Sequence, residues 1–405
     1  MPTIRRIPPS ALAIAAQGAV SLNSLALAVA VARNTTVVEF AYFSLALPLY
    51  AILLRTVRVL FLIPRQIRYR NEDIQGSGRA VTKAATVFSI AGVFPIALFS
   101  LALPDNIAPW TLALSLCLPA LMLYDSVRNE FLSQKRFWRV LFSDIAWLTT
   151  CMALFILNET HQSDLPPQVM FGLWAAPPLI IGLVNYATLP SQGALNQSVK
   201  SEFLLAKSRT RDCISDVISS TLSVQALPYI LVALASQTLV AGFRGGQTLL
   251  GPINAAIMGV TPLLQMSTAK AKNASSVYRT TIKWSALTTV ISIVYGSALY
   301  LLPDALGTSL LGDTWSITQE LLIATTATVA FRAPYLAAVT ALRSLGRDNL
   351  LVRLRFFSTS TLLLSASLGA TYLDSSGAIW AIALSAALSS FLALAILHRL
   401  ARQIS

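Results

Sequence analysis

The sequence predicts an all-α polytopic membrane protein, with about twelve transmembrane helices in two six-helix lobes around a central cavity. Of its 405 residues, 55% are hydrophobic and only 12% are charged, against about 25% charged residues in soluble proteins. Twelve apolar stretches of about 20 residues, the length that crosses a bilayer, follow one another. Basic residues concentrate in alternate links between them. Together these features exclude a soluble enzyme, a disordered chain and a disulfide scaffold.

The first half contains six of the apolar stretches, each bounded by charged residues or by clusters of Pro, Gly, Asn and Asp. The fourth is the least continuous, because Pro109 and Pro119 interrupt it. The six predicted spans are Ala11–Ala32, Phe40–Ile63, Ala84–Leu103, Trp110–Tyr124, Val140–Leu157 and Val169–Thr188.

The second half contains six more stretches of the same kind. Its fourth stretch holds Arg332 and Pro334 in the interior, and the proline should disturb the helix locally. The six predicted spans are Ile214–Leu234, Gly245–Met266, Trp284–Leu302, Ile317–Leu342, Phe356–Tyr372 and Ala378–Leu397.

The longest internal link, about Leu189–Asp212, divides the chain into equal halves. We therefore expect an N-terminal lobe over residues 1–190, a cytoplasmic linker over 191–212 and a C-terminal lobe over 213–405. Thr36–Tyr42 and Thr238–Arg244 each open the second span of a half, and each places a small residue before an aromatic. Since both halves start on the same side, they would form a parallel repeat.

The positive charge predicts the orientation of the chain. With both termini in the cytoplasm, the cytoplasmic segments carry 25 of the 30 Lys and Arg residues, while the external links carry no lysine and are acidic. This distribution explains the net charge of +13 without nucleic acid, because the cations face anionic headgroups. The cytoplasmic cations are Arg5, Arg6, Arg65, Arg68, Arg70, Arg79, Lys83, Arg128, Lys135, Arg136, Arg139, Lys200, Lys207, Arg209, Arg211, Lys270, Lys272, Arg279, Lys283, Arg343, Arg347, Arg353, Arg355, Arg399 and Arg402.

Cysteine and histidine point to no metal, cofactor or catalytic centre. The three cysteines, Cys117, Cys151 and Cys213, lie far apart in apolar surroundings without ligand spacing. The two histidines are too few for a metal site or a proton relay.

Polar residues recur on one face of several spans, and these are the candidate residues of a cavity. Lone Ser and Thr residues also serve as ordinary helix–helix contacts, arginines near a span end can extend to the interface, and the acidic residues can simply pair with arginines. The candidate substrate-binding residues are Arg55, Arg58, Arg244, Gln247, Asn254, Thr325, Thr328 and Arg332, with Asp144 and Asp216 as candidates for ion coupling or charge pairing.

Arg332 is the strongest of these candidates. It lies about 11 residues from Arg343, or roughly 16 Å along a helix, near the middle of the bilayer. An arginine there costs at least about 2.5 kcal/mol on insertion scales. Because embedded cations outnumber embedded anions, the cavity favours an anionic substrate, and phosphate or pyrophosphate suits the planar fork of arginine.

Three segments resemble bacterial polysaccharide flippases of the multidrug/oligosaccharidyl-lipid/polysaccharide (MOP) exporter superfamily. Val240–Pro252 reads VAGFRGGQTLLGP and resembles the opening of the family's C-terminal half. Glu39–Ala46 (EFAYFSLA) is similar to the matching N-terminal segment, although Ala41 stands where the family commonly has glycine. Ala341–Arg347 (ALRSLGR) resembles the loop after the tenth helix.

The resemblance implies a multi-pass transporter of the bacterial cytoplasmic membrane that works by alternating access. It would flip an undecaprenyl-pyrophosphate-linked oligosaccharide, a precursor of cell-surface polysaccharide, alongside other envelope polysaccharide synthesis proteins. Arg55, Arg58, Arg332 and Arg244 match the cationic cavity residues thought to contact the phosphates. The chain carries no ATP-binding loop, so an ion or substrate gradient would supply the energy.

Three alternatives stay open. A multidrug or small-solute exporter of the same superfamily is one, although the first span lacks the acidic residue that a cation-coupled exporter would use. A membrane polymerase or ligase is another, but the largest external segments, Asn158–Val169 and Pro303–Ile317, are short and contain no arginine. A non-transporting scaffold for envelope synthesis is the third.

Overall fold

The computed structural model describes residues 9–63, 78–160, 166–189, 199–208, 210, 214, 217, 221, 223–269 and 273–403. Every regular element in these residues is a helix, and none of them forms a strand, which confirms the all-α fold class. The chain folds as two compact units. The N-terminal unit comprises Met1–Val31 and Tyr42–Gln225, and the C-terminal unit comprises Ala32–Ala41 and Ala226–Ser405.

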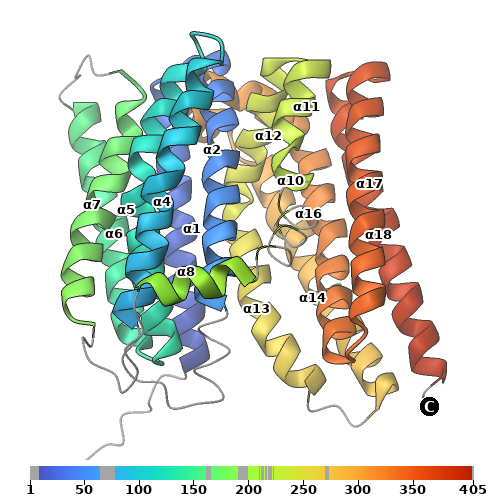
Figure 1. Cartoon of the computed structure of the whole chain (residues 1–405). Coiled ribbons are helices and arrows are strands. Elements are labelled where there is room, and N and C mark those ends of the chain that lie inside the picture. The colour runs from blue at the N-terminus through green and yellow to red at the C-terminus, as the bar shows by residue number, and fades with distance from the viewer. Residues whose placement is uncertain are drawn as a thin grey trace, which may run out of the picture. The chain divides into compact units, whose positions relative to one another are not determined.

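The helices of the N-terminal unit run side by side, apart from α8, which lies across them (Figure 1). Helix α8 packs on α4, and its Phe203 ring meets the Phe61 ring edge-on at 5.6 Å between centroids. The helices are α1 (Pro9–Arg33), α2 (Val37–Val57), η1 (Arg58–Leu62), α4 (Gly78–Leu101), α5 (Ala108–Ser133), α6 (Phe137–Thr160), α7 (Val169–Ala187), α8 (Val199–Ser208) and the short α10 (Ser223–Gln225).

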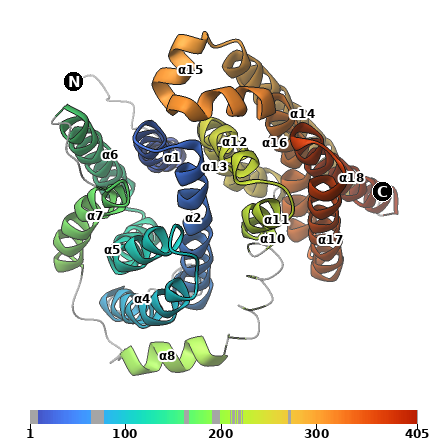
Figure 2. The same ribbon diagram turned by 90° about the horizontal axis from the view of Figure 1, so that it is seen from above.

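The C-terminal unit is built around α16, which contacts α12, α13, α14 and α18 (Figure 2). Its helices are α11 (Leu227–Leu234), α12 (Gln237–Leu249), α13 (Gly251–Ala269), α14 (Ala274–Tyr300), α15 (Asp304–Leu311), η3 (Gly312–Thr314), α16 (Trp315–Ser344), α17 (Asp348–Tyr372) and α18 (Ser375–Gln403).

Helices occupy the predicted spans wherever the structure describes them. Nine stretches of the described chain are helical, long and apolar enough to cross a membrane by length and composition. The fourth predicted span is more regular than its sequence suggests. Helix α5 continues from Ala108 to Ser133, because Pro109 occupies the first turn, where a missing N–H costs nothing. The seventh predicted span, Ile214–Leu234, lies partly outside the described residues.

The eighth predicted span, Gly245–Met266, is not one helix. Helix α12 ends at Leu249 and α13 begins at Gly251, so the prediction of a single continuous span was wrong at this point. Pro252 gives the physical reason, because its nitrogen cannot donate to the carbonyl of Thr248. The backbone stays nearly helical through Leu250, whose N–H donates to the Gly246 carbonyl at 3.0 Å.

The two helices that contain the segments compared above as an internal repeat both begin with side-chain caps. At the start of α2, the Glu39 N–H donates to the Thr36 hydroxyl at 3.3 Å, and the Thr36 N–H donates to the Glu39 carboxylate at 2.9 Å. This reciprocal pair is a capping box. At the start of α12, the Leu239 N–H donates to the Ser236 hydroxyl at 3.1 Å.

Glycines allow α12 to approach α16 closely. A Cβ atom on Gly245 would collide with the hydroxyl oxygen of Thr318, and one on Gly246 would lie 3.2 Å from the Thr325 side chain. A Cβ atom on Gly242 would likewise collide with the Ile317 side chain. The run of glycines in the VAGFRGGQ segment therefore forms a small-residue contact between two helices, as is common in membranes.

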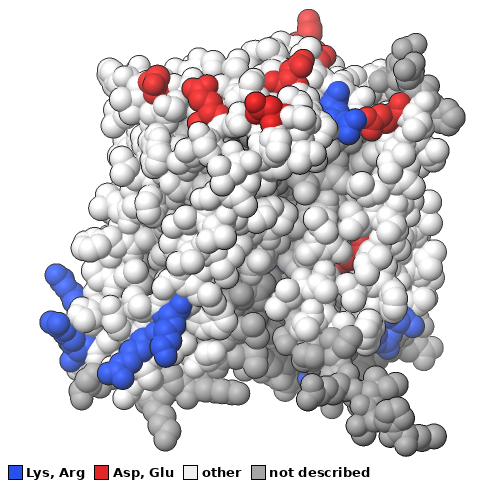
Figure 3. Space-filling model, turned by 180° about the vertical axis from the view of Figure 1, so that it is seen from behind, with Lys and Arg blue, Asp and Glu red and all other residues white. Residues whose placement is uncertain are grey.

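Charged residues of the C-terminal unit separate toward opposite ends of its helices (Figure 3). Asp304 begins α15 and Asp374 follows α17, whereas Arg343 and Arg402 occupy the last turns of α16 and α18. Between the ends, large apolar side chains such as Phe391 and Leu384 point outward. Outward-facing apolar residues suit a bilayer, which solvates them.

Candidate functional site

Two ion pairs join described residues inside the N-terminal unit. Arg58, at the start of η1, holds Asp125 of α5 with two parallel hydrogen bonds: Nε donates to Oδ2 at 3.0 Å and Nη2 to Oδ1 at 2.5 Å. Asn129 donates to the same carboxylate at 3.1 Å. The Arg58 side chain keeps 37% of its surface exposed, so part of its fork is accessible.

The second pair lies deeper. Arg128 of α5 donates from Nε to both oxygens of Asp144 of α6 at 3.0 Å, and the Tyr124 hydroxyl donates to Oδ1 at 2.6 Å. The Asp144 side chain is completely buried and that of Arg128 is 9% exposed. Burial of these charges is tolerated because they pair with each other and both oxygens of the Asp144 carboxylate accept hydrogen bonds.

The ion pairs bear on two residues named from the sequence. Arg128, predicted above to lie in a cytoplasmic segment, is buried near the C-terminal end of α5. Asp144 pairs with Arg128 of the same unit. Asp125 was missed entirely. Its signal in the sequence is the spacing Asp125-x-x-Arg128, which puts an acid and a base on one face of α5.

Arg332 differs from these arginines. It lies at the middle of the 30-residue helix α16, and its side chain is exposed. No Asp or Glu of the described chain pairs with it, and the nearest acid along α16, Glu320, is twelve residues or roughly 18 Å away. The Tyr335 hydroxyl, on the next turn of α16, lies within its electrostatic reach.

The backbone around Arg332 is held by hydroxyls of neighbouring helices. Pro334 cannot donate to the carbonyl of Ala330, and that carbonyl instead accepts a hydrogen bond from Thr289 of α14 at 3.2 Å. The adjacent carbonyl of Phe331 accepts one from Ser390 of α18. In a membrane, such side-chain donors replace the missing backbone bond, and here they fix the turn that carries Arg332.

Arg244 is a second cation with few partners. It lies on α12, on the face opposite the glycines that contact α16. Its Nη1 donates to Gln247 at 3.4 Å, while its Nε is buried without a hydrogen bond. Arg244 and Gln247, both predicted above as candidate cavity residues, are therefore in contact with each other.

The other candidate residues divide into packing and exposed positions. Thr325 is buried against Gly246, and its hydroxyl donates to the Leu321 carbonyl at 2.9 Å; Thr328 donates to Ala324 at 3.0 Å. Asn254 of α13 is exposed. Arg55 is half-buried in the last turn of α2. Asp216 lies outside the described residues.

A buried polar residue that the sequence reasoning did not single out is Asn23 of α1. Its side chain is completely buried, and neither the amide nitrogen nor the amide oxygen has a hydrogen-bond partner. Leaving such a group unpaired costs about 1–3 kcal/mol.

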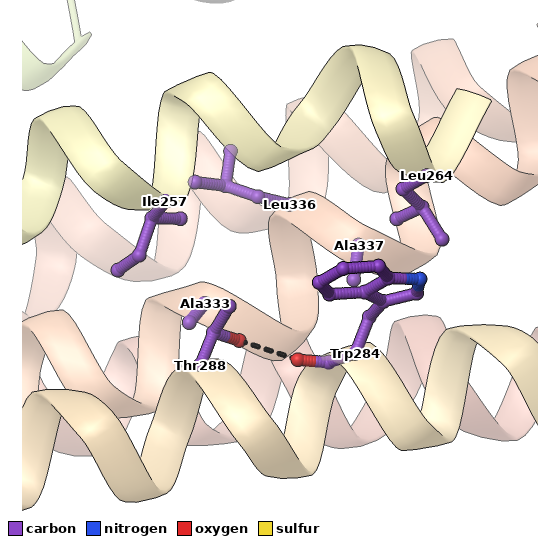
Figure 4. Close-up of a pocket in the computed structure, with 7 residues that line it drawn as sticks. All are labelled: Ile257, Leu264, Trp284, Thr288, Ala333, Leu336 and Ala337. Atoms are coloured by element: carbon purple, nitrogen blue, oxygen red, sulfur yellow. Dashed lines mark hydrogen bonds between the residues drawn. The ribbon is translucent and has the colours of Figure 1, made fainter. Parts of the chain in front are cut away.

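Two hollows of the C-terminal unit have apolar linings. The first lies between α13, α14 and α16, with a volume of only about 20 Å³ (Figure 4). Trp284 and Ala337 face each other across it, and the Thr288 hydroxyl donates to the Trp284 carbonyl at 2.8 Å. This volume admits about one water molecule, so the hollow is no substrate pocket.

The second hollow is a groove of about 400 Å³ between α14 and α16. Its lining includes small residues, Gly296, Thr326 and Ala330 among them, and the aromatic side chains of Tyr300 and Phe331. Among the residues that the structure describes, no group of His, Cys, Asp and Glu is arranged to hold a metal ion.

The fold is that of transporters of the MOP superfamily, and the chain is a multi-pass membrane protein. An outward-facing multidrug resistance MATE family transporter of this superfamily matches with a TM-score of 0.65 and 12% sequence identity, over 97% of this chain and 96% of that chain. No protein-family model and no curated protein sequence matches the chain.

Two further solved structures have the same fold. The lipid II flippase MurJ, in an inward closed conformation, matches with a TM-score of 0.73 and 12% identity over 96% of this chain and 87% of that chain. The eukaryotic MATE transporter AtDTX14 matches with a TM-score of 0.62 and 13% identity over 97% of both chains.

Proposed function

We propose that this protein is a transporter that flips a polyprenyl-pyrophosphate-linked oligosaccharide across a bacterial cytoplasmic membrane by alternating access. One observation carries the proposal: Arg332 presents an exposed guanidinium at mid-span, and no carboxylate in the described part of the chain pairs with it. An uncompensated arginine at this depth is costly, and an anionic substrate that enters the site would offset that cost.

The pattern of charge pairing supports an anionic substrate. The N-terminal unit pairs Arg58 and Arg128 with carboxylates, so each pair has no net charge. In the C-terminal unit, Arg332 and Arg244 lie at half-buried or exposed mid-helix positions without such a partner among the described residues. Arg332 is therefore the primary phosphate contact, with Arg244, Arg58 and Arg55 as further contacts.

The likeness to solved structures supports transport but leaves two substrate classes. One of the similar proteins is a lipid II flippase, and another is a multidrug resistance transporter. A multidrug exporter is thus the second candidate for this chain. An unpaired arginine favours the flippase, because it would repel the cationic drugs that an exporter commonly carries.

Further elements of the proposal follow from the sequence. Residues 1–190 and 213–405 form the two lobes, joined by a cytoplasmic linker, with both termini in the cytoplasm. Asp144, and Asp216 with it, serve charge pairing or ion coupling. The protein has no catalytic role of its own and passes its substrate between enzymes that synthesise envelope polysaccharide.

Reconstitution of the full chain into proteoliposomes tests this function. We expect a labelled polyprenyl-pyrophosphate saccharide to become accessible to an impermeant reagent faster than in empty vesicles, while a fluorescent cationic drug is not transported. Drug transport without movement of the lipid-linked sugar would reject the flippase in favour of the exporter.

Cysteine labelling in intact cells tests the orientation. Cysteines placed at Lys135 and Lys272 are expected to stay unlabelled by an impermeant reagent, whereas one placed at Asp313 should react. Labelling at Lys135 or Lys272 would contradict a cytoplasmic position for these segments.

A further inference from the structure

A short helix of the N-terminal unit, α8, lies across the spanning helices and packs on α4 at the outer edge of the unit (Figure 1, Figure 2). Its Phe203 ring contacts the Phe61 ring, which in turn contacts the Phe88 ring of α4 at 5.7 Å between centroids. Phe61 is the last residue but one of η1, so α8 lies at the level where the second predicted span ends. In a bilayer, this level is the boundary between the hydrocarbon and the headgroups, where helices parallel to the membrane plane lie.

The ten residues of α8 divide into an inner and an outer face. Glu202 and Ala206 are buried against the unit. Lys200, Leu204 and Lys207 are exposed, and Leu204 keeps 61% of its surface accessible. Residues four and seven positions apart share one face of a helix. The two lysines therefore flank the leucine on the outer face, roughly 10 Å apart along the helix axis.

The outer face combines unneutralised positive charge with an exposed apolar residue. Neither lysine forms an ion pair with an Asp or Glu that the structure describes. A phospholipid with an anionic headgroup complements both features, because its phosphate meets the ammonium groups and its acyl chains cover the leucine. The flexible lysine stems can extend along the hydrocarbon edge toward the phosphates. Free phosphate or an acidic protein segment would neutralise the lysines but leave Leu204 uncovered.

We propose that the outer face of α8 binds anionic phospholipids of the surrounding leaflet, with Lys200 and Lys207 on the headgroup phosphates and Leu204 among the first carbons of the acyl chains. The orientation proposed above makes this the cytoplasmic leaflet, whose surface is negatively charged. Because α8 belongs to the link between the two units, the bound lipid holds that link against the bilayer. The site uses none of the candidate cavity residues, so it goes beyond the proposed transport function and does not depend on the transported substrate.

Lipid binding to the purified full-length protein tests the proposal. Delipidated protein in a neutral detergent is titrated with dioctanoyl phosphatidylglycerol, and the affinity is measured by microscale thermophoresis at low and at high salt. Dioctanoyl phosphatidylcholine tests the need for net negative charge, and glycerol 3-phosphate tests the need for acyl chains. The variants are Lys200→Gln, Lys207→Gln, both changes together, Lys200→Arg with Lys207→Arg, and Leu204→Ser. Lys135→Gln is the matched control, since Lys135 is an exposed lysine of the same unit in the turn between α5 and α6.

We expect phosphatidylglycerol to bind more tightly than phosphatidylcholine, and glycerol 3-phosphate to bind most weakly. Each single glutamine change should weaken the binding of phosphatidylglycerol about 5-fold, and the two together about 30-fold. The double glutamine variant should also lose most of the salt dependence, because that dependence comes from the two charges. Leu204→Ser should bind more weakly but keep its salt dependence. The double arginine variant and Lys135→Gln should bind as the unmodified protein does.

Equal affinity of the double glutamine variant and Lys135→Gln for phosphatidylglycerol would overturn the inference. Binding of glycerol 3-phosphate as tight as that of phosphatidylglycerol would also overturn it, because the site would then recognise free phosphate. If the double variant is not recovered as folded protein, the two single glutamine variants decide, and unchanged affinity in both rejects the site. A protein that binds phosphatidylglycerol through these lysines but moves no lipid-linked sugar keeps the α8 site and loses the flippase.

Discussion

Neutralising Asp144 should destabilise the N-terminal unit more than any surface change. Asp144→Asn leaves Arg128, with 9% of its side chain exposed, as a buried cation without a counter-ion. Removal of one partner of a buried pair costs about 3–5 kcal/mol. Tyr124→Phe, which removes only the 2.6 Å hydrogen bond to the carboxylate, should cost roughly 1.5–3 kcal/mol.

The double variant Arg128→Met with Asp144→Leu gives the diagnostic result. With both charges removed, it should be more stable than either single variant, because apolar residues of similar volume replace a buried ion pair with little cost. Unfolding in detergent micelles, followed by tryptophan fluorescence, measures the stability of the unmodified protein, the two single variants and the double variant. Asp105→Asn, at an exposed acid between α4 and α5, is the control and should shift stability by less than about 0.5 kcal/mol. Destabilisation of the double variant by the sum of the two single changes would refute the reasoning.

Three further changes probe other contacts. Gly245→Leu should disrupt the α12–α16 contact, because even a Cβ atom there would collide with the Thr318 hydroxyl. We expect a lower midpoint of thermal unfolding, and an unchanged midpoint would contradict the contact. Asn23→Leu should raise stability by about 1–3 kcal/mol, since it removes an unpaired buried amide, and destabilisation would show that the amide has a partner. Thr289→Val should destabilise the protein by about 1–3 kcal/mol by leaving the Ala330 carbonyl without its donor, whereas a neutral result in the same unfolding assay would assign that carbonyl another partner.

Much of the fold could be predicted from the sequence, because length and apolarity define a spanning helix almost completely. The stretches Ala84–Leu103 and Val140–Leu157, for example, coincide with α4 and α6 within a few residues. Proline made the local predictions less reliable. Pro119 is accommodated within α5, while Pro252 separates α12 from α13. The difference depends on packing, which periodicity does not describe.

The candidate site was predictable only in part. Arg332 stood out because a charge at mid-span is costly wherever the surrounding helices lie. Which groups of other helices lie near it depends on tertiary contact, which the sequence does not show. The partner of Asp144 was equally hidden, since Arg128 lies near a helix end and its sequence position resembles that of a loop residue. The glycines of α12 were recognised from a family resemblance, but their role against Thr318 and Thr325 required the structure.

The central claim is that Arg332 attracts the phosphate headgroup of a transported lipid. Flipping of a labelled polyprenyl-pyrophosphate saccharide by Arg332→Ala in proteoliposomes, at matched protein abundance, tests it most directly. We predict that Arg332→Ala is inserted normally but has strongly reduced or no transport, with partial recovery in Arg332→Lys. The substrate affinity should fall by about 1.5–3 kcal/mol, or roughly 10- to 150-fold. Transport by Arg332→Ala at the rate of the unmodified protein would contradict the claim.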